Sequence, residues 1–207
     1  MDQPCQPKQS DRVPMTDEQI RAVTLGQLAP PARIALADYD PAWPALYARE
    51  AERIRTALGD RVVLLEHVGS TSVPGLAAKP IIDVLLMVAD SSNESSYVPS
   101  LEAAGYVLRI REPEWFEHRL FKGPGTDVNL HVFSAGSSEP QRMLRFRGHL
   151  RVHAADRQLY ERTKRHLADR VWEHVQNYAD AKSDVIDAIM TRAQASELSQ
   201  APVARIP

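Results

Sequence analysis

A small-residue loop followed by a lone acid is the first place where this sequence offers chemistry. Residues 66–88 read EHVGSTSVPGLAAKPIIDVLLMV, so Gly69 and Ser70 close one apolar run and Asp83 lies inside the next. Gly-Ser turns suit phosphate oxygens, because glycine lets the backbone approach an anion and oriented N–H groups attract it. We therefore expect Gly69, Ser70 and Thr71 to contact the phosphates of a ligand.

Asp83 lies among isoleucine, valine and leucine residues, so it requires a partner. Burying an unpaired carboxylate costs several kcal/mol. Lys79, four residues earlier, is one candidate partner, and a divalent metal ion is another. The alternative is a structural Asp83 that accepts hydrogen bonds from the N–H groups of the Gly-Ser turn.

A second polar set follows in the segment TDVNLHVF. Asp127, Asn129 and His131 alternate there with apolar residues, so their side chains project from one face of a strand. If that strand lies beside the strand of Asp83, Asp127 could hold a metal ion and Asn129 could contact a ligand. His131 could then act as a metal ligand or a general base, roles that suit histidine near neutral pH. The alternative is the solvated face of an edge strand.

Four basic residues complete the candidate site. Arg119 and Lys122 in EHRLFKG are candidate phosphate or carboxylate partners, or else solvated strand charges. Lys164 and Lys182 each follow a tyrosine by four residues and could point toward a triphosphate. The alternative for both is an amphipathic helix whose lysines extend along its surface to water.

The surrounding pattern predicts the elements that position these residues. Apolar periodicity and turn residues indicate strands near residues 34–37, 61–68, 79–90, 106–110, 117–123 and 126–134. Helical spacing and capping residues indicate helices near residues 16–28, 40–60, 95–106, 139–153, 154–175 and 177–196. We expect an α+β fold with an N-terminal extension (1–30, partly disordered with a short helix), one domain (31–195, helical over 139–195) and a flexible tail (196–207).

Composition excludes several classes of protein. The chain has 207 residues, a net charge of −2 and one cysteine, so neither a polyanion-binding field nor a disulfide framework is expected. We expect no nucleic-acid partner and no membrane partner, because no apolar run approaches the length of a membrane span. The first residues lack an apolar stretch of signal-peptide type, and we expect a cytoplasmic protein.

The segment HVGSTSVPGLAAKPIIDV resembles the signature of the GrpB family, predicted relatives of the nucleotidyltransferase fold. The later segments LEAAGY, NLHVF, LYERTKRHLA and YADAKSDVI match further landmarks, so the resemblance runs from about Ile34 to Ala193. It implies a mixed sheet with flanking helices, a Gly-Ser loop that grips the phosphates of an NTP, and strand carboxylates that hold Mg²⁺. Two such ions would polarise the α-phosphate and activate an attacking hydroxyl.

One departure from the nucleotidyltransferase pattern leaves two functions open. Active nucleotidyltransferases carry Asp-x-Asp after the loop, whereas here Leu85 follows Asp83 in the second acidic position. The resemblance implies an enzyme that transfers a nucleotidyl group from an NTP to a small-molecule acceptor with Mg²⁺. The alternative is a catalytically inactive nucleotide- or metabolite-binding or scaffolding module, by analogy with the family's occurrence as an appended domain on dephospho-CoA kinases.

Overall fold

A mixed five-stranded sheet forms the centre of the protein. The computed structural model describes residues 14–200. The strand order is β2-β3-β6-β5-β4, with β3 parallel to β6 and the other neighbours antiparallel. The strands are β2 (Leu64–Val68), β3 (Ile82–Val88), β4 (Val107–Glu112), β5 (His118–Lys122) and β6 (Val128–Ser134). The predicted α+β fold with a mixed sheet is confirmed.

One face of the sheet packs against α2 (Trp43–Leu58) and α3 (Val98–Ala103). Alternate strand residues such as Val84 and Leu130 meet Ile54 of α2 in the main core, and all three are fully buried. Because side chains alternate across a strand, the residues between them point to the other face. Asp83 and His131 therefore lie on the face opposite this core.

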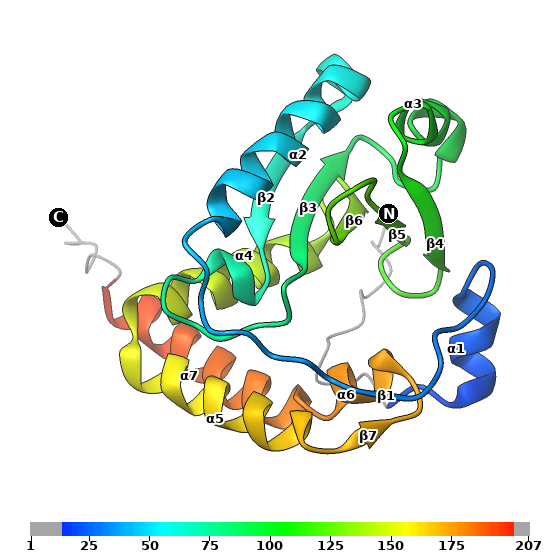
Figure 1. Cartoon of the computed structure of the whole chain (residues 1–207). Helices are drawn as coiled ribbons and strands as arrows, with labels where there is room; N and C mark the ends of the chain where they lie inside the picture. The colour runs from blue at the N-terminus through cyan, green and yellow to red at the C-terminus, as the bar shows by residue number, and fades with distance from the viewer. Residues whose placement is uncertain (1–13, 201–207) are drawn as a thin grey trace, which may run out of the picture.

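The other face is covered by α4 (Ser138–Val152), and α5 (Ala154–Ala168), α6 (Val175–Asp180) and α7 (Ser183–Gln200) complete this side. Figure 1 shows α5, α6 and α7 along one side of the sheet, together with α1 (Asp17–Val23) and the strand pair β1 (Ala32–Arg33) and β7 (Val171–Trp172). Met143 of α4 packs on Leu85 and Phe133 at one end of this face. The end that carries Asp83 faces a cavity.

Several predicted boundaries differ from the structure. The predicted helix 154–175 stops at Ala168, because Val171 and Trp172 pair with β1 and the Trp172 indole donates a hydrogen bond to the carbonyl of Leu167. The strand predicted at 34–37 is reduced to a single bridge between Ala37 and Ala78.

Helix α7 continues over residues 196–200, where a flexible tail was expected. The predicted disorder of residues 1–13 and the end of the tail, 201–207, lie outside the described residues. Inside the described part of the predicted N-terminal extension, the expected short helix is present as α1, and Thr16 and Gln19 form its capping box.

Candidate functional site

Asp83, Asn129 and His131 come together because β3 lies beside β6. The strand register places Asp83 opposite Asn129 and Leu85 opposite His131. The Asn129 amide donates a hydrogen bond of 2.8 Å to Asp83 Oδ1, and His131 Nε2 lies 3.8 Å from the same oxygen. Burial, the largest influence, raises the pKa of Asp83, but His131, Asn129 and Lys79 together hold that pKa below its ordinary value. Asp83 is therefore an ionised group at neutral pH.

Gly69 brings the backbone of the loop directly against Asp83. Its φ of 68° lies in the left-handed region, and a Cβ built on it would lie 2.2 Å from Asp83 Oδ2. Only glycine combines that conformation with so close an approach. The backbone of Gly69 therefore packs directly against the Asp83 side chain, and a larger residue at position 69 would collide with it.

The two hydroxyl residues after Gly69 have different surroundings. Ser70 Oγ accepts a hydrogen bond of 3.0 Å from Lys164 Nζ. Thr71 is buried, and its hydroxyl donates to the carbonyl of Ile81 and meets His67 Nε2 at 3.1 Å. Ser70 is thus placed for ligand contact, whereas the predicted ligand-binding hydroxyl of Thr71 is engaged in holding the loop to the start of β3.

Two arginines of α4 fix the loop from the other side. Arg147 donates to the carbonyl of His67 and to the Glu66 carboxylate, and Arg151 donates twice to the carbonyl of Ser72. These bonds bind the backbone on both sides of the Gly-Ser turn. Such support restricts the motion of the loop.

Three lysines surround the same cavity. Lys79 precedes β3, Lys164 lies on α5 and Lys182 directly precedes α7. Burial and then the charge of Lys182 lower the pKa of Lys164 to about 7. Burial and then Lys182 lower the pKa of Lys79 to about 8, and burial lowers the pKa of Lys182 to about 8 although Asp83 and Asp180 raise it.

Aromatic rings hold these lysines in place. Lys182 Nζ lies 4.6 Å and Lys79 Nζ 5.7 Å from the ring centre of Tyr178, and Lys164 Nζ lies 4.9 Å from that of Tyr160. Lys164 also donates to the carbonyl of Ala77. The alternative of lysines extending along a helix surface to water is wrong for Lys164, which is 2% exposed.

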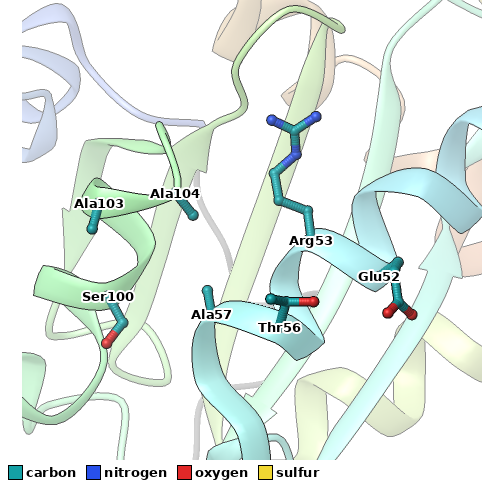
Figure 2. Close-up of a pocket in the computed structure, with 7 residues that line it drawn as sticks. All are labelled: Glu52, Arg53, Thr56, Ala57, Ser100, Ala103 and Ala104. Carbon is teal, nitrogen blue, oxygen red and sulfur yellow. The ribbon is translucent and has the colours of Figure 1, made fainter.

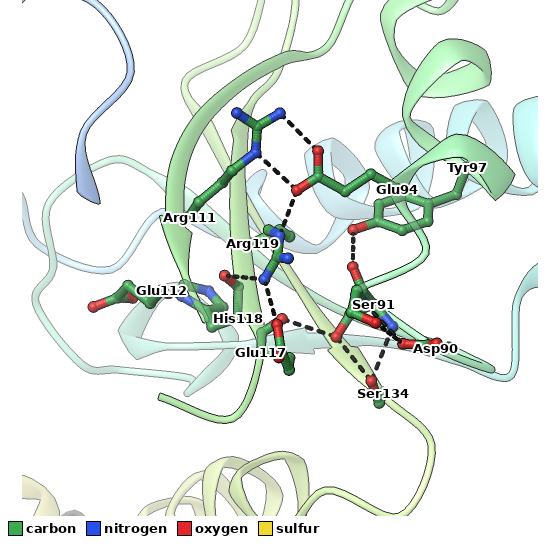
Figure 3. A network of polar contacts seen from close by, with 11 residues as sticks. Asp90, Ser91, Glu94, Tyr97, Arg111, Glu112, Glu117, His118, Arg119 and Ser134 are labelled. Carbon is green, nitrogen blue, oxygen red and sulfur yellow. Dashed lines mark hydrogen bonds and ion pairs between the residues drawn. The ribbon is translucent and has the colours of Figure 1, made fainter. Parts of the chain in front are cut away.

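Arg119 does not belong to this site. It pairs with Val132 in the register, and its side chain points to the α2–α3 side of the sheet, where Glu94 Oε1 accepts a bond of 2.7 Å from its Nε. Figure 3 shows Glu94 shared between Arg119 and Arg111 beside Tyr97. The sequence hypothesis of a phosphate contact is wrong for Arg119, because strand alternation turns it away from the cavity.

Asp127 and Lys122 pair with each other at the margin of the site. Lys122 Nζ donates a hydrogen bond of 3.1 Å to Asp127 Oδ1, and the two side chains are 43% and 57% exposed. Lys122 lines the edge of the cavity. Asp127 directly precedes β6, and its carboxylate is engaged by Lys122 instead of completing an acidic pair with Asp83.

The donor set does not fit the expected magnesium centre. Within residues 14–200, no group of three or more His, Cys, Asp or Glu side chains is placed to hold a metal ion. Leu85, in the second acidic position, is fully buried, and three lysines adjoin the cavity near Asp83. Two-metal catalysis requires several carboxylates around the ions, so we derive no step through magnesium.

Sequence reasoning missed two residues behind His131. His118 Nε2 lies 3.1 Å from His131 Nδ1, and His118 Nδ1 lies 2.7 Å from Glu112 Oε2. The side chains of His118 and Glu112 are 4% and 9% exposed, against 23% for His131. The spacing of His118, Leu120 and Lys122 at every second residue, which places them on one face of a strand, was the available signal, but its use required the register of β5 on β6.

The cavity that these groups line has a volume of about 690 Å³, within the range of small-molecule sites. Asp83, Asn129, His131 and the three lysines line it together with other polar groups, and part of the wall is apolar, including Leu36, Met143, Phe146, Trp172 and Ile186. Such a cavity can hold a ligand that has both a charged group and a ring or chain. A depression between α2 and α3, lined mainly by small side chains (Figure 2), has no comparable convergence of polar groups.

Comparison with known proteins shows which family the chain belongs to. The sequence profile of the family described as "GrpB protein" matches residues 33–192. The chain belongs to the GrpB family. A UPF0157 protein of Halalkalibacterium halodurans is 60% identical over 188 residues, which cover 90% of this chain and 96% of that protein. A UPF0157 protein of Streptomyces coelicolor is 52% identical over 163 residues, or 79% of this chain and 86% of that protein.

The GrpB resemblance found in the sequence is therefore confirmed. The crystal structure of the conserved protein GrpB from Enterococcus faecalis superposes with a TM-score of 0.69 at 30% identity, and the match covers 79% of this chain and 99% of that chain. No helix within residues 14–200 has the length and apolar character that crossing a bilayer requires.

Proposed function

We propose that this GrpB protein binds a nucleotide or a similar phosphorylated molecule in the cavity, with its phosphates against Lys79, Lys164 and Lys182. The observation that carries the proposal is the gathering of three lysines around the Gly69–Ser70 loop. Burial and mutual repulsion lower the pKa of Lys164 to about 7 and the pKa of Lys79 to about 8. A polyanion in the cavity would offset that repulsion and favour the charged lysines.

The reaction that the site supports is transfer of a nucleotidyl group from an NTP to a hydroxyl of a small molecule. His131 takes the proton of the attacking hydroxyl, whose oxygen forms a bond to the α-phosphorus. The bond from that phosphorus to the bridging oxygen breaks, and pyrophosphate leaves with the electron pair. The lysines supply positive charge to the phosphate oxygens.

Leu85 favours a second candidate function. Leu85 leaves β3 without a second acid, and within residues 14–200 no group of three or more candidate ligands is placed to hold a metal ion, whereas the three lysines remain beside the cavity. A binding module without turnover is consistent with that composition. Both functions require the phosphorylated ligand, and they differ only in the release of pyrophosphate.

Thermal unfolding with ligands tests the shared requirement. A ligand that binds only the native state at one hundred times its dissociation constant stabilises that state by about 2.7 kcal/mol. We expect ATP, GTP, CTP, UTP or pyrophosphate to raise the unfolding temperature in EDTA, and Lys79→Met to remove most of the effect. Arg49→Met, which removes an exposed positive charge from α2, is the control that should retain it.

Failure of all five ligands to stabilise the wild-type protein, with or without Mg²⁺, would exclude the proposed ligand class. Stabilisation that requires Mg²⁺ would contradict the assignment of the phosphate charge to the lysines. Pyrophosphate release with a panel of hydroxyl acceptors separates the enzyme from the binding module.

A further inference from the structure

Two imidazoles connect two carboxylates in a chain of contacts across four strands. Glu112 on β4 meets His118 on β5 at 2.7 Å, and His118 meets His131 on β6 at 3.1 Å. His131 then faces Asp83 on β3 at 3.8 Å. Solvent exposure increases along the chain from the buried Glu112–His118 pair to the partly exposed His131–Asp83 pair.

The direction of each hydrogen bond in this chain follows from the Glu112 carboxylate, which can only accept. Glu112 accepts from His118 Nδ1–H, so Nε2 of a neutral His118 carries the lone pair that accepts from His131 Nδ1–H. His131 Nε2 is thereby the ring nitrogen left for exchange with the cavity. Nε2 of His131 is free of a proton in the state that accepts one from a ligand hydroxyl, and after that transfer the ionised Asp83 stabilises the new Nε2–H.

The rings are held in this arrangement by packing. His118 stacks on Phe133 with a centroid distance of 4.8 Å and meets the edge of Trp115 at 5.3 Å. The His118 and His131 rings are inclined by only 20°. A pair of imidazoles fixed edge to edge can exchange a proton without a change of rotamer.

We propose that Glu112, His118 and His131 form a proton relay in which His131 Nε2 exchanges a proton with the bound ligand and Glu112 and His118 set its tautomer and basicity. His131 is the catalytic residue, and Glu112 and His118 are positioning residues. The relay deepens the proposed nucleotidyl transfer and rests on it for the identity of the proton donor, an attacking hydroxyl. In that step the O–H bond breaks, an Nε2–H bond forms, and the oxygen keeps the electron pair for its bond to phosphorus.

Other charged groups adjoin the relay from each neighbouring element, and all of them remain in the test variants. Besides Asp83 of β3, the cavity is lined by Lys79 before β3, Lys122 of β5, Glu139 and Arg142 of α4, Lys164 of α5 and Lys182 before α7. Glu139 and Arg142 pair with each other at 3.4 Å. Their charges act on His131 equally in wild type and variants, so a comparison isolates the contribution of Glu112.

Imidazole ¹⁵N NMR of the full chain, without ligand, tests the relay. We expect His118 to carry its proton on Nδ1, and His131 to lose about one pKa unit in Glu112→Gln, which keeps an acceptor for His118 but removes the charge. Glu94→Gln removes a carboxylate from the opposite face of the sheet and should leave the pKa of His131 unchanged. If Glu112→Gln fails to fold, His118→Asn keeps a donor for Glu112 and severs the link to His131, with the same expected shift.

An unchanged His131 pKa in either folded relay variant, or His118 protonated only on Nε2, would overturn the relay. Stabilisation by pyrophosphate is measured on the same samples and should persist in Glu112→Gln, because all three lysines remain. If the His131 pKa shifts but neither pyrophosphate nor an NTP stabilises the protein, the relay is supported and the proposed function is refuted. If these ligands stabilise the protein but the His131 pKa does not shift, the phosphate site is supported and the relay is refuted.

Discussion

Replacing Lys182 by methionine should stabilise the ligand-free protein while weakening its hold on phosphates. An unfolded lysine has a pKa of 10.5, whereas burial lowers the pKa of Lys182 in the folded protein to about 8. At about 1.4 kcal/mol per pKa unit, a charged Lys182 costs folding about 3 kcal/mol. Because its side chain retains some solvent contact, we discount this cost and expect a gain of about 1–2 kcal/mol.

The expected gain has a defined dependence on pH. The folded pKa is lowered, so the unfolded chain binds the lysine proton more readily, and the destabilisation is complete below the folded pKa of about 8. It declines as pH rises and is absent above the unfolded pKa. Lys182→Met should therefore have a larger stability advantage at pH 7 than at pH 10.

Urea unfolding of wild type and variant at pH 7 and pH 10 measures this difference. Methionine is unbranched, apolar and one atom shorter than lysine, so it can pack against the ring of Tyr178 after the Nζ contact is lost. Lys122→Met is the matched control, since Lys122 is 43% exposed and pairs with Asp127, and its loss should change stability by less than about 0.5 kcal/mol. A Lys182→Met protein that is less stable than wild type at pH 7, or equally stabilised at both pH values, would refute the reasoning.

Three further predictions concern the loop, the sheet and pH. Gly69→Ala should cost about 2–4 kcal/mol in urea unfolding, because the new Cβ adds a collision with Asp83 to the strain of a left-handed φ. Gly75→Ala carries the strain alone, with no atom within 4 Å, and should cost about 1–2 kcal/mol; equal costs would contradict the close approach. Arg119→Met should lower the free energy of unfolding by about 2–3 kcal/mol, since Glu94 loses a buried partner. Stabilisation by pyrophosphate should be retained, and its loss would show that Arg119 contributes to the phosphate site. Because the cavity lysines lose their protons between about pH 7 and 8, ATP affinity measured by calorimetry should fall as pH rises from 7 to 9, and a constant affinity would exclude them as its ligands.

The sequence identified the residues at the centre of the candidate site, and their convergence depended on one strand pairing. The Gly-Ser turn before Asp83, and the polar Asn129 and His131 on either side of an apolar residue, are local patterns that the sequence displays directly. Their convergence needed only the pairing of β3 with β6, and the structure has that pairing. The register then brings Asn129 opposite Asp83.

The sequence was insufficient for contacts that depend on distant register. Glu112 faces His118 after an irregularity between Leu108 and Ile110, which changes the relative position of β4 and β5. A bulge of this kind moves side chains relative to the neighbouring strand, and alternation alone does not locate it. Arg119 was misassigned for a related reason, because its neighbours alone did not say which face of the sheet held the site.

The lysines illustrate a different limit. Spacing within a helix predicts a tyrosine and a lysine on one face, but it does not say whether that face meets water or a cavity. The packing of α5 and α7 beside the Gly69 loop decides the matter for Lys164 and Lys182. Their lowered pKa values arise from that packing and cannot be derived from local sequence.

Proton uptake on ATP binding is the most direct test of the central claim, that the lysine cluster holds phosphate. At pH 8, two lysines with pKa values of about 8 and one of about 7 together lack about two protons. Calorimetric titration with ATP, in EDTA and in buffers of different ionisation enthalpy, measures the protons that binding takes up. We predict an uptake of about one to two protons per ATP at pH 8; binding without proton uptake, or no binding, would contradict the account.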